Sequence, residues 1–291
     1  MKYEIFVLAS RTIPRVIVEA PAFWLWPTAL SLDAPVVAIL WQSLLARSVA
    51  VTLNQFEPVA LGLAVWLIYI VDHLIDTAKP ATGEWEPPRK LFYRSHWGAG
   101  LGLALAIAVA LTACGIRLLW PSTLRGGLEL SLGVAGYFSL IHLAPGRWRI
   151  LWPREAAVAT LFTLGTFGAV WLGNGRDLAP LLLPALIFTL LCWTNCSLIE
   201  IWEWEAGGSA ERDSPNRAAR WVVKQIGTVA GAVMVLAFLQ PSLFATAGVI
   251  SAAGLWVLAL NRRAIPIRLV SPLADLALYS PVLLWALRTI I

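Results

Sequence analysis

Long apolar stretches, joined by loops that alternate between strongly basic and nearly uncharged, constrain this chain more than any other feature. Each is long enough for a bilayer-spanning helix, which needs about 20 mostly apolar residues. The nine stretches cover residues 33–52, 56–76, 96–115, 126–145, 154–172, 178–201, 216–238, 242–261 and 268–290. They are too long and too uniformly apolar for the alternating strands of a membrane barrel. The sequence therefore predicts an all-α polytopic membrane protein with about nine transmembrane helices around a central cavity.

The distribution of Lys and Arg over the loops predicts the orientation of the chain. Alternate loops, counted from the N-terminal segment, hold 17 of the 22 basic residues, whereas the loops between them hold four and Arg47 lies within the first stretch. Cytoplasmic loops of membrane proteins carry the excess of Lys and Arg. We therefore expect a cytoplasmic N-terminus and an outward-facing C-terminus, in a bacterial inner membrane. A count of eight spans would break this alternation.

The chain divides into residues 1–32, an N-terminal cytoplasmic or interfacial segment, and residues 33–291, the transmembrane domain. A glutamate and two prolines interrupt the apolar residues 16–32, which disfavours a cleavable signal peptide and favours an interfacial helix. The pI near 9.4 does not indicate nucleic acid as a partner. The basic residues lie in short loops beside the spans, where orientation and anionic membrane lipids account for them.

The first cluster of polar residues closes the second apolar stretch, and ionisable residues within spans are candidates for function. Asp72 and Asp76 are four residues apart, so both carboxylates project from one helix face, with Tyr69 one turn earlier. A divalent cation reverses the repulsion between two such carboxylates, and Mg²⁺ typically binds one or two carboxylates together with substrate phosphates. Tyr69 and His73 are candidates for a proton acceptor or an orienting group. The alternative is a set of solvated residues at the end of a span.

The second cluster closes the sixth apolar stretch at a matching depth. Glu200 and Glu203 are neighbours on one helix face, Asn195 lies a turn deeper, and Glu205 points elsewhere on a continued helix. The alternative is an interfacial helix end, in which the acidic side chains alternate with Ile and Trp. Four polar groups at the depth of the first cluster favour a functional site.

Basic residues follow both clusters along the chain. They are Lys79, Arg89, Lys90 and Arg94 after the first cluster, and Arg212, Arg217 and Arg220 after the second. The candidates for substrate binding among them are Lys79, Arg89, Arg94, Arg212 and Arg217. Carboxylates, a divalent metal and Arg or Lys together form a typical diphosphate site, because metal and cations neutralise the charge of the leaving group. The positive-inside bias alone also explains most of these basic residues.

This arrangement resembles the UbiA superfamily of intramembrane prenyltransferases over roughly residues 30–290. Asp72 and Asp76 match the two aspartates of the family motif Asn-x-x-x-Asp-x-x-x-Asp, while Ile68 stands at the Asn position. Asn195, Glu200 and Glu203 occupy the region of the family's second carboxylate motif with other residue types and spacing. The resemblance implies Mg²⁺ as the cofactor, held by these four carboxylates. It also implies a prenyl diphosphate donor and a lipophilic acceptor as partners.

Three alternatives to a prenyltransferase remain open at this stage. The same fold could cyclise a prenyl chain without an acceptor, as a membrane terpene cyclase. A non-catalytic UbiA-like protein could bind a lipid or a partner complex, and a transporter is weakened by the absence of a clear internal repeat. Mg²⁺-dependent binding of a prenyl diphosphate separates the two enzymes from the other two. Among the single polar residues in spans, Asp275 is the one expected to face the cavity.

Overall fold

The computed structural model describes residues 2–3, 18–19, 25–78, 86–143, 154–206 and 217–290. Its long helices are α2 (Asp33–Ser48), α3 (Glu57–Thr77), α5 (Trp97–Leu118), α6 (Pro121–Leu143), α8 (Arg154–Gly173), α9 (Ala179–Ala206), α11 (Ile226–Leu239) and α12 (Leu243–Leu260). Shorter helices are α1 (Trp26–Ala29), α4 (Pro88–Ser95), α10 (Arg217–Lys224), α13 (Ile267–Ala277) and α14 (Ser280–Ile290), with a 3₁₀ turn at Arg262–Ala264. The strands β1 (Lys2–Tyr3) and β2 (Val18–Glu19) form one short antiparallel pair.

Each predicted apolar stretch is helical over most of its length, which confirms a helical protein with several membrane-spanning candidates. By length and composition, five helices in the described part of the chain can cross a membrane, namely α3, α5, α8, α9 and α12. The number rises to seven if each bent pair counts as one span: α10 with α11, bent by 72°, and α13 with α14, bent by 55°. Helix α2, with 16 residues, is shorter than the roughly 20 residues of a full span. The predicted total of nine stays a prediction.

Local polar contacts fix where two of the helices begin. Before α3, the backbone N–H of Asn54 donates to Glu57 Oε2 at 2.9 Å, and the N–H of Phe56 donates to Asn54 Oδ1 at 3.1 Å. Ser242 precedes α12, and its side chain accepts the N–H of Ala245 at 3.1 Å. Ser242 thereby satisfies a backbone N–H that has no partner within the first turn of α12, whereas the contacts of Asn54 and Glu57 fix the segment that leads into α3.

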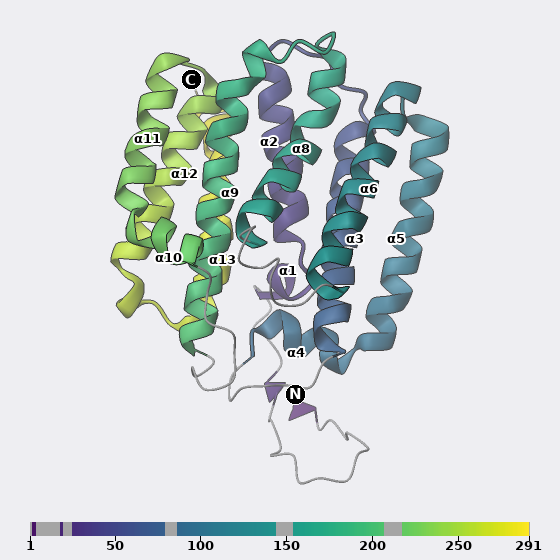
Figure 1. The fold of residues 1–291 in the computed structure, drawn as a ribbon, viewed down its shortest axis with the longest axis vertical. Coiled ribbons are helices and arrows are strands. Elements are labelled where there is room, and N and C mark those ends of the chain that lie inside the picture. Colours follow the sequence, from purple (N-terminus) through teal and green to yellow (C-terminus); the bar gives the residue numbers. More distant parts are fainter. Residues whose placement is uncertain are drawn as a thin grey trace.

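A group of aromatic side chains joins the helices at the centre of the bundle, where α2 lies between α8, α9 and α3 (Figure 1). Trp41 of α2 is fully buried, and its ring centroid lies 4.9 Å from those of Phe188 and Phe244. Phe167 of α8 contacts the same two rings. The indole Nε1 of Trp41 donates to the carbonyl of Leu278 at 2.8 Å. Large buried aromatic side chains contribute strongly to packing, so this group holds α2 against α8, α9 and α12.

The outward faces of the outer helices are apolar. Exposed large side chains include Leu105 and Val109 of α5, Leu132 of α6 and Phe238 of α11, each at least 61% exposed. Soluble monomers rarely expose continuous apolar surface of this kind, which marks protein or membrane contact. The exposed apolar faces and the long apolar helices together indicate an integral membrane protein.

Helix α4 is fixed against one end of the bundle, beneath α3 in Figure 1. Its Tyr93 is fully buried, with its ring 5.3 Å from that of His73. The Tyr93 hydroxyl donates to the carbonyl of Leu30 at 3.2 Å. Burial of this ring sets the rotation of α4, and thereby the direction in which Arg89 and Lys90 project.

Candidate functional site

A cavity of about 220 Å³ lies at the end of the bundle that α4 covers. Its walls come from residues of α1, α2, α3, α4, α6, α8, α9 and α13 and from the segment between α1 and α2. Polar lining residues are Thr28, Ser31, Asp33, Tyr69, Asp72, His73, Asp76, Arg89, Lys90, Tyr137, Arg154, Glu155, Asn195, Cys196, Glu200, Glu203 and Asp275. Apolar lining residues are Ala34, Ile68, Phe138, Val158 and Ile199.

The two predicted clusters line this one cavity. Tyr69, Asp72 and Asp76 approach from α3, and Asn195, Glu200 and Glu203 approach from α9. Tyr69, Asp72 and Asp76 share one face of α3, and Glu200 and Glu203 are neighbours on α9, because residues three or four apart lie side by side on a helix. Asp275 of α13 also lines the cavity, as its position in the last apolar stretch led us to expect.

The cavity lining carries more acidic than basic side chains. Its acidic residues are Asp33, Asp72, Asp76, Glu155, Glu200, Glu203 and Asp275, and its basic residues are Arg89, Lys90 and Arg154. Seven carboxylates against three cations leave a formal excess of four negative charges. An anionic ligand therefore needs additional cations to enter this cavity.

The aspartates of the first motif each lie beside a basic side chain from another element. Lys90 Nζ lies 3.3 Å from Asp76 Oδ2, and Arg154 NH2 lies 3.5 Å from Asp72 Oδ2. All four side chains keep between 17% and 39% of their surface exposed. These side chains are partly exposed and line the cavity, so a ligand in the cavity can reach them.

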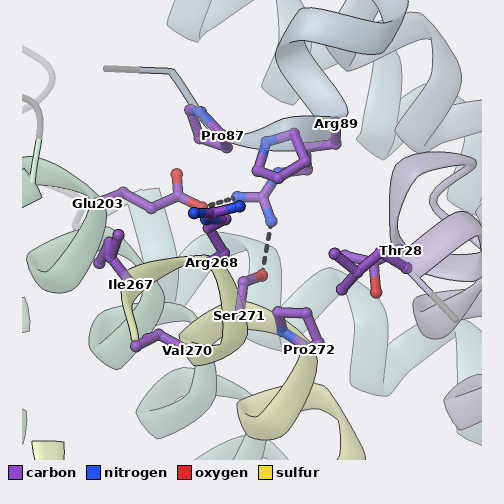
Figure 2. A pocket seen from close by; sticks show the side chains of 11 residues that line it. Thr28, Pro87, Arg89, Glu203, Ile267, Arg268, Val270, Ser271 and Pro272 are labelled. Atoms are coloured by element: carbon purple, nitrogen blue, oxygen red, sulfur yellow. Dashed lines mark hydrogen bonds and ion pairs between the residues drawn. The ribbon is translucent and has the colours of Figure 1, made fainter. Parts of the chain in front are cut away.

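Arg89 has a different position and connects three helices. It forms an ion pair with Glu203 of α9 and donates through NH1 to Ser271 Oγ of α13 at 2.7 Å. Figure 2 shows this guanidinium between the two side chains, in a smaller pocket beside the cavity. Burial disfavours the charge on the guanidinium, but Glu203 and then Asp275 raise the pKa of Arg89 above its ordinary value. The guanidinium of Arg89 therefore stays charged and links α4 to α9 through its ion pair with Glu203.

Three buried side chains of the cavity lining, those of Ser31, His73 and Asn195, have polar atoms without a hydrogen-bond partner within the described residues. Asn195 Nδ2 donates to Asp275 Oδ1 at 2.9 Å, while Asn195 Oδ1 has no hydrogen-bond partner there. Both ring nitrogens of His73 are likewise buried without a described partner. Such groups are rare in proteins because leaving them without a hydrogen bond costs free energy.

The remaining predicted substrate-binding residues do not line the cavity. Arg94 donates to Glu86 and to the carbonyl of Thr77. Arg217 is exposed at the first turn of α10. Lys79 and Arg212 lie outside the described residues. Of the basic residues that follow the two clusters, Arg89 and Lys90 are the two that line the cavity in the part of the chain that the structure describes.

The sequence interpretation did not include three charged lining residues among its candidates, namely Arg154, Glu155 and Asp33. Arg154 and Glu155 occupy the first turn of α8, and Asp33 opens α2. The sequence did contain a signal for these three residues, because each lies where a loop meets an apolar stretch. Charged residues within spans face the interior of the bundle or a water-filled cavity.

Known proteins give no further guide to this cavity. No family model, curated protein or solved structure matches the chain. The resemblance to the UbiA superfamily therefore depends on the residues themselves.

The lining residues fit Mg²⁺ only in company with a phosphate ligand. In the ranges that the structure describes, no three His, Cys, Asp or Glu side chains are grouped closely enough to hold a metal ion by themselves. Mg²⁺ needs no such group, because it commonly binds one or two carboxylates and completes its shell with substrate phosphates and water. Asp72, Asp76 and Glu200 offer the hard oxygen ligands that Mg²⁺ prefers. Glu203, the fourth predicted ligand, instead pairs with Arg89.

Proposed function

We propose that this protein is an integral membrane prenyltransferase of the UbiA type, which moves a prenyl group from a prenyl diphosphate to a lipophilic acceptor. The observation that carries the proposal is the shared cavity. Asp72 and Asp76 of α3 and Glu200 of α9, far apart in sequence, line it together with Lys90 and Arg154. Carboxylates beside Arg and Lys in one cavity suit a diphosphate that arrives with Mg²⁺.

The diphosphate would bind at the mouth of the cavity. Lys90 and Arg154 lie there, each beside an aspartate that a bound phosphate and its metal would engage in turn. Asp72, Asp76 and Glu200 would hold Mg²⁺, which supplies positive charge to the leaving diphosphate. Because the lining has more carboxylates than basic side chains, it would repel a diphosphate that arrived without a cation. Binding of the diphosphate would therefore require Mg²⁺.

The prenyl chain would lie along the apolar part of the lining, which includes Ile68, Val158 and Ile199. In the reaction, the bond between the first prenyl carbon and the diphosphate oxygen breaks, and the diphosphate leaves with the electron pair. The acceptor then forms a bond to that carbon and releases a proton. The aromatic faces of Tyr137 and Phe138 line the same cavity and are able to stabilise the positive charge on the allylic carbon.

A topology of nine spans completes the proposal, with the cavity open toward the cytoplasm of a bacterial cell. The basic residues of the cavity mouth, Arg89, Lys90 and Arg154, all belong to the loop set with the Lys and Arg excess. That set is expected on the cytoplasmic side.

An assay of diphosphate release tests the proposal. The protein in lipid nanodiscs would receive a labelled C15 prenyl diphosphate and Mg²⁺, with or without a bacterial lipid extract as the source of acceptor. A transferase releases diphosphate together with a labelled adduct, and only when the extract is present. Release without extract, with a cyclic hydrocarbon as product, would indicate a terpene cyclase. Absence of both release and binding would contradict an enzymatic role and leave a lipid- or partner-binding protein.

A further inference from the structure

Helix α10 presents two different faces to its surroundings. Its exposed large side chains are those of Arg217, Arg220, Trp221 and Lys224. Residues three, four and seven positions apart lie on the same side of a helix, so these four side chains form one face, the basic face of α10. Ala219 and Val222 are buried on the other side. Helix α10 packs against α9 and α11, which leaves the basic face turned away from the bundle.

No carboxylate neutralises the basic face. Helix α10 contains no acidic residue, and none of the ion pairs within the described ranges involves Arg217, Arg220 or Lys224. The basic residues of the cavity differ in this respect, because each of them lies beside a carboxylate. The three charges of the basic face are therefore open to an anion from outside the chain.

The position of α10 brings this face to the end of a membrane-spanning candidate. Helices α10 and α11 form one of the two bent pairs, with a bend of 72° between them. Helix α11 is apolar throughout, and its Met234 and Phe238 are 57% and 83% exposed, as expected of side chains that contact lipid. Because α11 runs across the bilayer in the proposed topology, α10 lies close to the membrane plane. Figure 1 shows α10 at the lower end of α11, beside α9.

The exposed ring of Trp221 indicates the kind of anion that this face suits. The ring is 57% exposed and shares the face with the three basic side chains. Trp is enriched at the level of the lipid head groups, where its ring contacts apolar carbons and its N–H contacts water. A phospholipid offers both a phosphate for the cations and apolar carbons for the indole, whereas a free phosphate ion offers only the charge. Basic residues on a helix at the membrane surface attract anionic lipids.

We propose that the basic face of α10 binds the phosphate groups of anionic phospholipids, such as phosphatidylglycerol, in the leaflet beside this end of the bundle. Arg217, Arg220 and Lys224 pair with the phosphates, and Trp221 packs against the glycerol region. Bound lipid thereby fixes the end of α11 at the membrane surface. This surface is separate from the proposed reaction site, because no residue of α10 lines the cavity.

Native mass spectrometry tests the proposal, since it measures binding of phosphatidylglycerol and of phosphatidylcholine, which has a phosphate but no net charge, to the detergent-purified protein. The wild type should bind phosphatidylglycerol about tenfold or more tightly. The triple variant Arg217→Gln, Arg220→Gln, Lys224→Gln should lose most of this preference and bind phosphatidylcholine as before. Its melting temperature should not change, because all three side chains are exposed.

A second triple variant, Arg117→Gln, Arg176→Gln, Arg263→Gln, is the matched control. It removes the same charge from exposed positions outside α10 and should keep the preference for phosphatidylglycerol. An equal loss in both triple variants would show an effect of net charge alone and overturn the assignment to α10. Equal affinity of the wild type for the two lipids would overturn it even if the first triple variant failed to fold.

A soluble competitor separates a lipid from a free phosphate as the ligand. Glycerol phosphate in excess should leave phosphatidylglycerol bound, and Trp221→Ala should weaken binding of this lipid without removing any charge. Displacement of the lipid by glycerol phosphate would show that the face binds a soluble phosphate and contradict the proposal. Unchanged lipid affinity in Trp221→Ala would contradict the packing of the indole against the lipid.

Discussion

Arg154 NH2 lies 3.5 Å from Asp72 Oδ2, so the first residue of α8 meets the first carboxylate of the motif on α3. Both side chains line the cavity and remain partly exposed. Under the proposed function, a phosphate would bind Arg154 while its Mg²⁺ binds Asp72, so the ligand would replace this ion pair.

Asp72→Asn should weaken Mg²⁺-dependent binding of a prenyl diphosphate by about tenfold or more, because one charged metal ligand is lost. The fraction of folded protein should change little, since the pair with Arg154 is open to solvent. Isothermal calorimetry with and without Mg²⁺ measures the effect. Glu129→Gln provides the control, because it removes a carboxylate from the exposed pair with Arg125. Unchanged affinity in Asp72→Asn would refute the metal role.

Arg89→Gln should act mainly on stability. It leaves Glu203 without its ion-pair partner and Ser271 without its donor. Breaking such a mostly buried pair from one side costs about 3 kcal/mol. Thermal unfolding in detergent should show a clear fall in melting temperature.

Arg263→Gln removes an exposed guanidinium from the same end of the bundle and is the matched control. It should leave the melting temperature unchanged. A melting temperature that is equally unchanged in Arg89→Gln would show that the link between α4, α9 and α13 contributes nothing to stability.

Trp41→Ala should be among the most destabilising single changes in the described part of the chain. It removes the fully buried ring that contacts Phe188 and Phe244, together with the hydrogen bond to the carbonyl of Leu278. Replacing a buried aromatic residue by Ala typically costs about 3–5 kcal/mol. Trp221→Ala, at an exposed position, should cost far less in the same unfolding assay. Equal losses would contradict the central position of Trp41.

Single cysteines at exposed basic positions test the topology. Arg217 lies in a segment between spans that is rich in Lys and Arg, and Arg176 lies in one that is nearly uncharged. Both residues are exposed, and Arg217→Cys and Arg176→Cys place one thiol in each segment. In a background without the three native cysteines, a membrane-impermeant thiol reagent added to intact cells should label Cys at 176 and not at 217. The positive-inside rule predicts this result. Labelling of both positions, or of neither, would contradict nine spans with a cytoplasmic N-terminus.

The sequence predicted helices well because long apolar runs in a membrane have few other stable structures. It did not predict the bend between α10 and α11, although a signal was present. Arg217, Arg220 and Lys224 alternate with buried Ala219 and Val222, which is the pattern of an amphipathic helix lying across the bundle end. The second bend falls before Pro281, which favours a new helix start.

The candidate site was predictable only in part. The spacing of Asp72 and Asp76 placed them on one face of a helix. Because they and Glu200 lie at a similar depth in their predicted spans, the sequence also predicted that they lie near each other. The pairing of Lys90 with Asp76 was not predictable, because it depends on the rotation of α4, which burial of Tyr93 fixes. The pairing of Glu203 with Arg89 was missed for the same reason.

The central claim is that the two clusters form one diphosphate site, and a double-mutant cycle tests it most directly. Affinity for a C15 prenyl diphosphate in the presence of Mg²⁺ is measured for the wild type, Asp72→Asn, Glu200→Gln and the double variant. Residues that share a bound metal and substrate show coupling, so the double variant should lose less affinity than the two single losses combined. Strictly additive losses, or no binding of prenyl diphosphate by the wild type, would contradict a shared site.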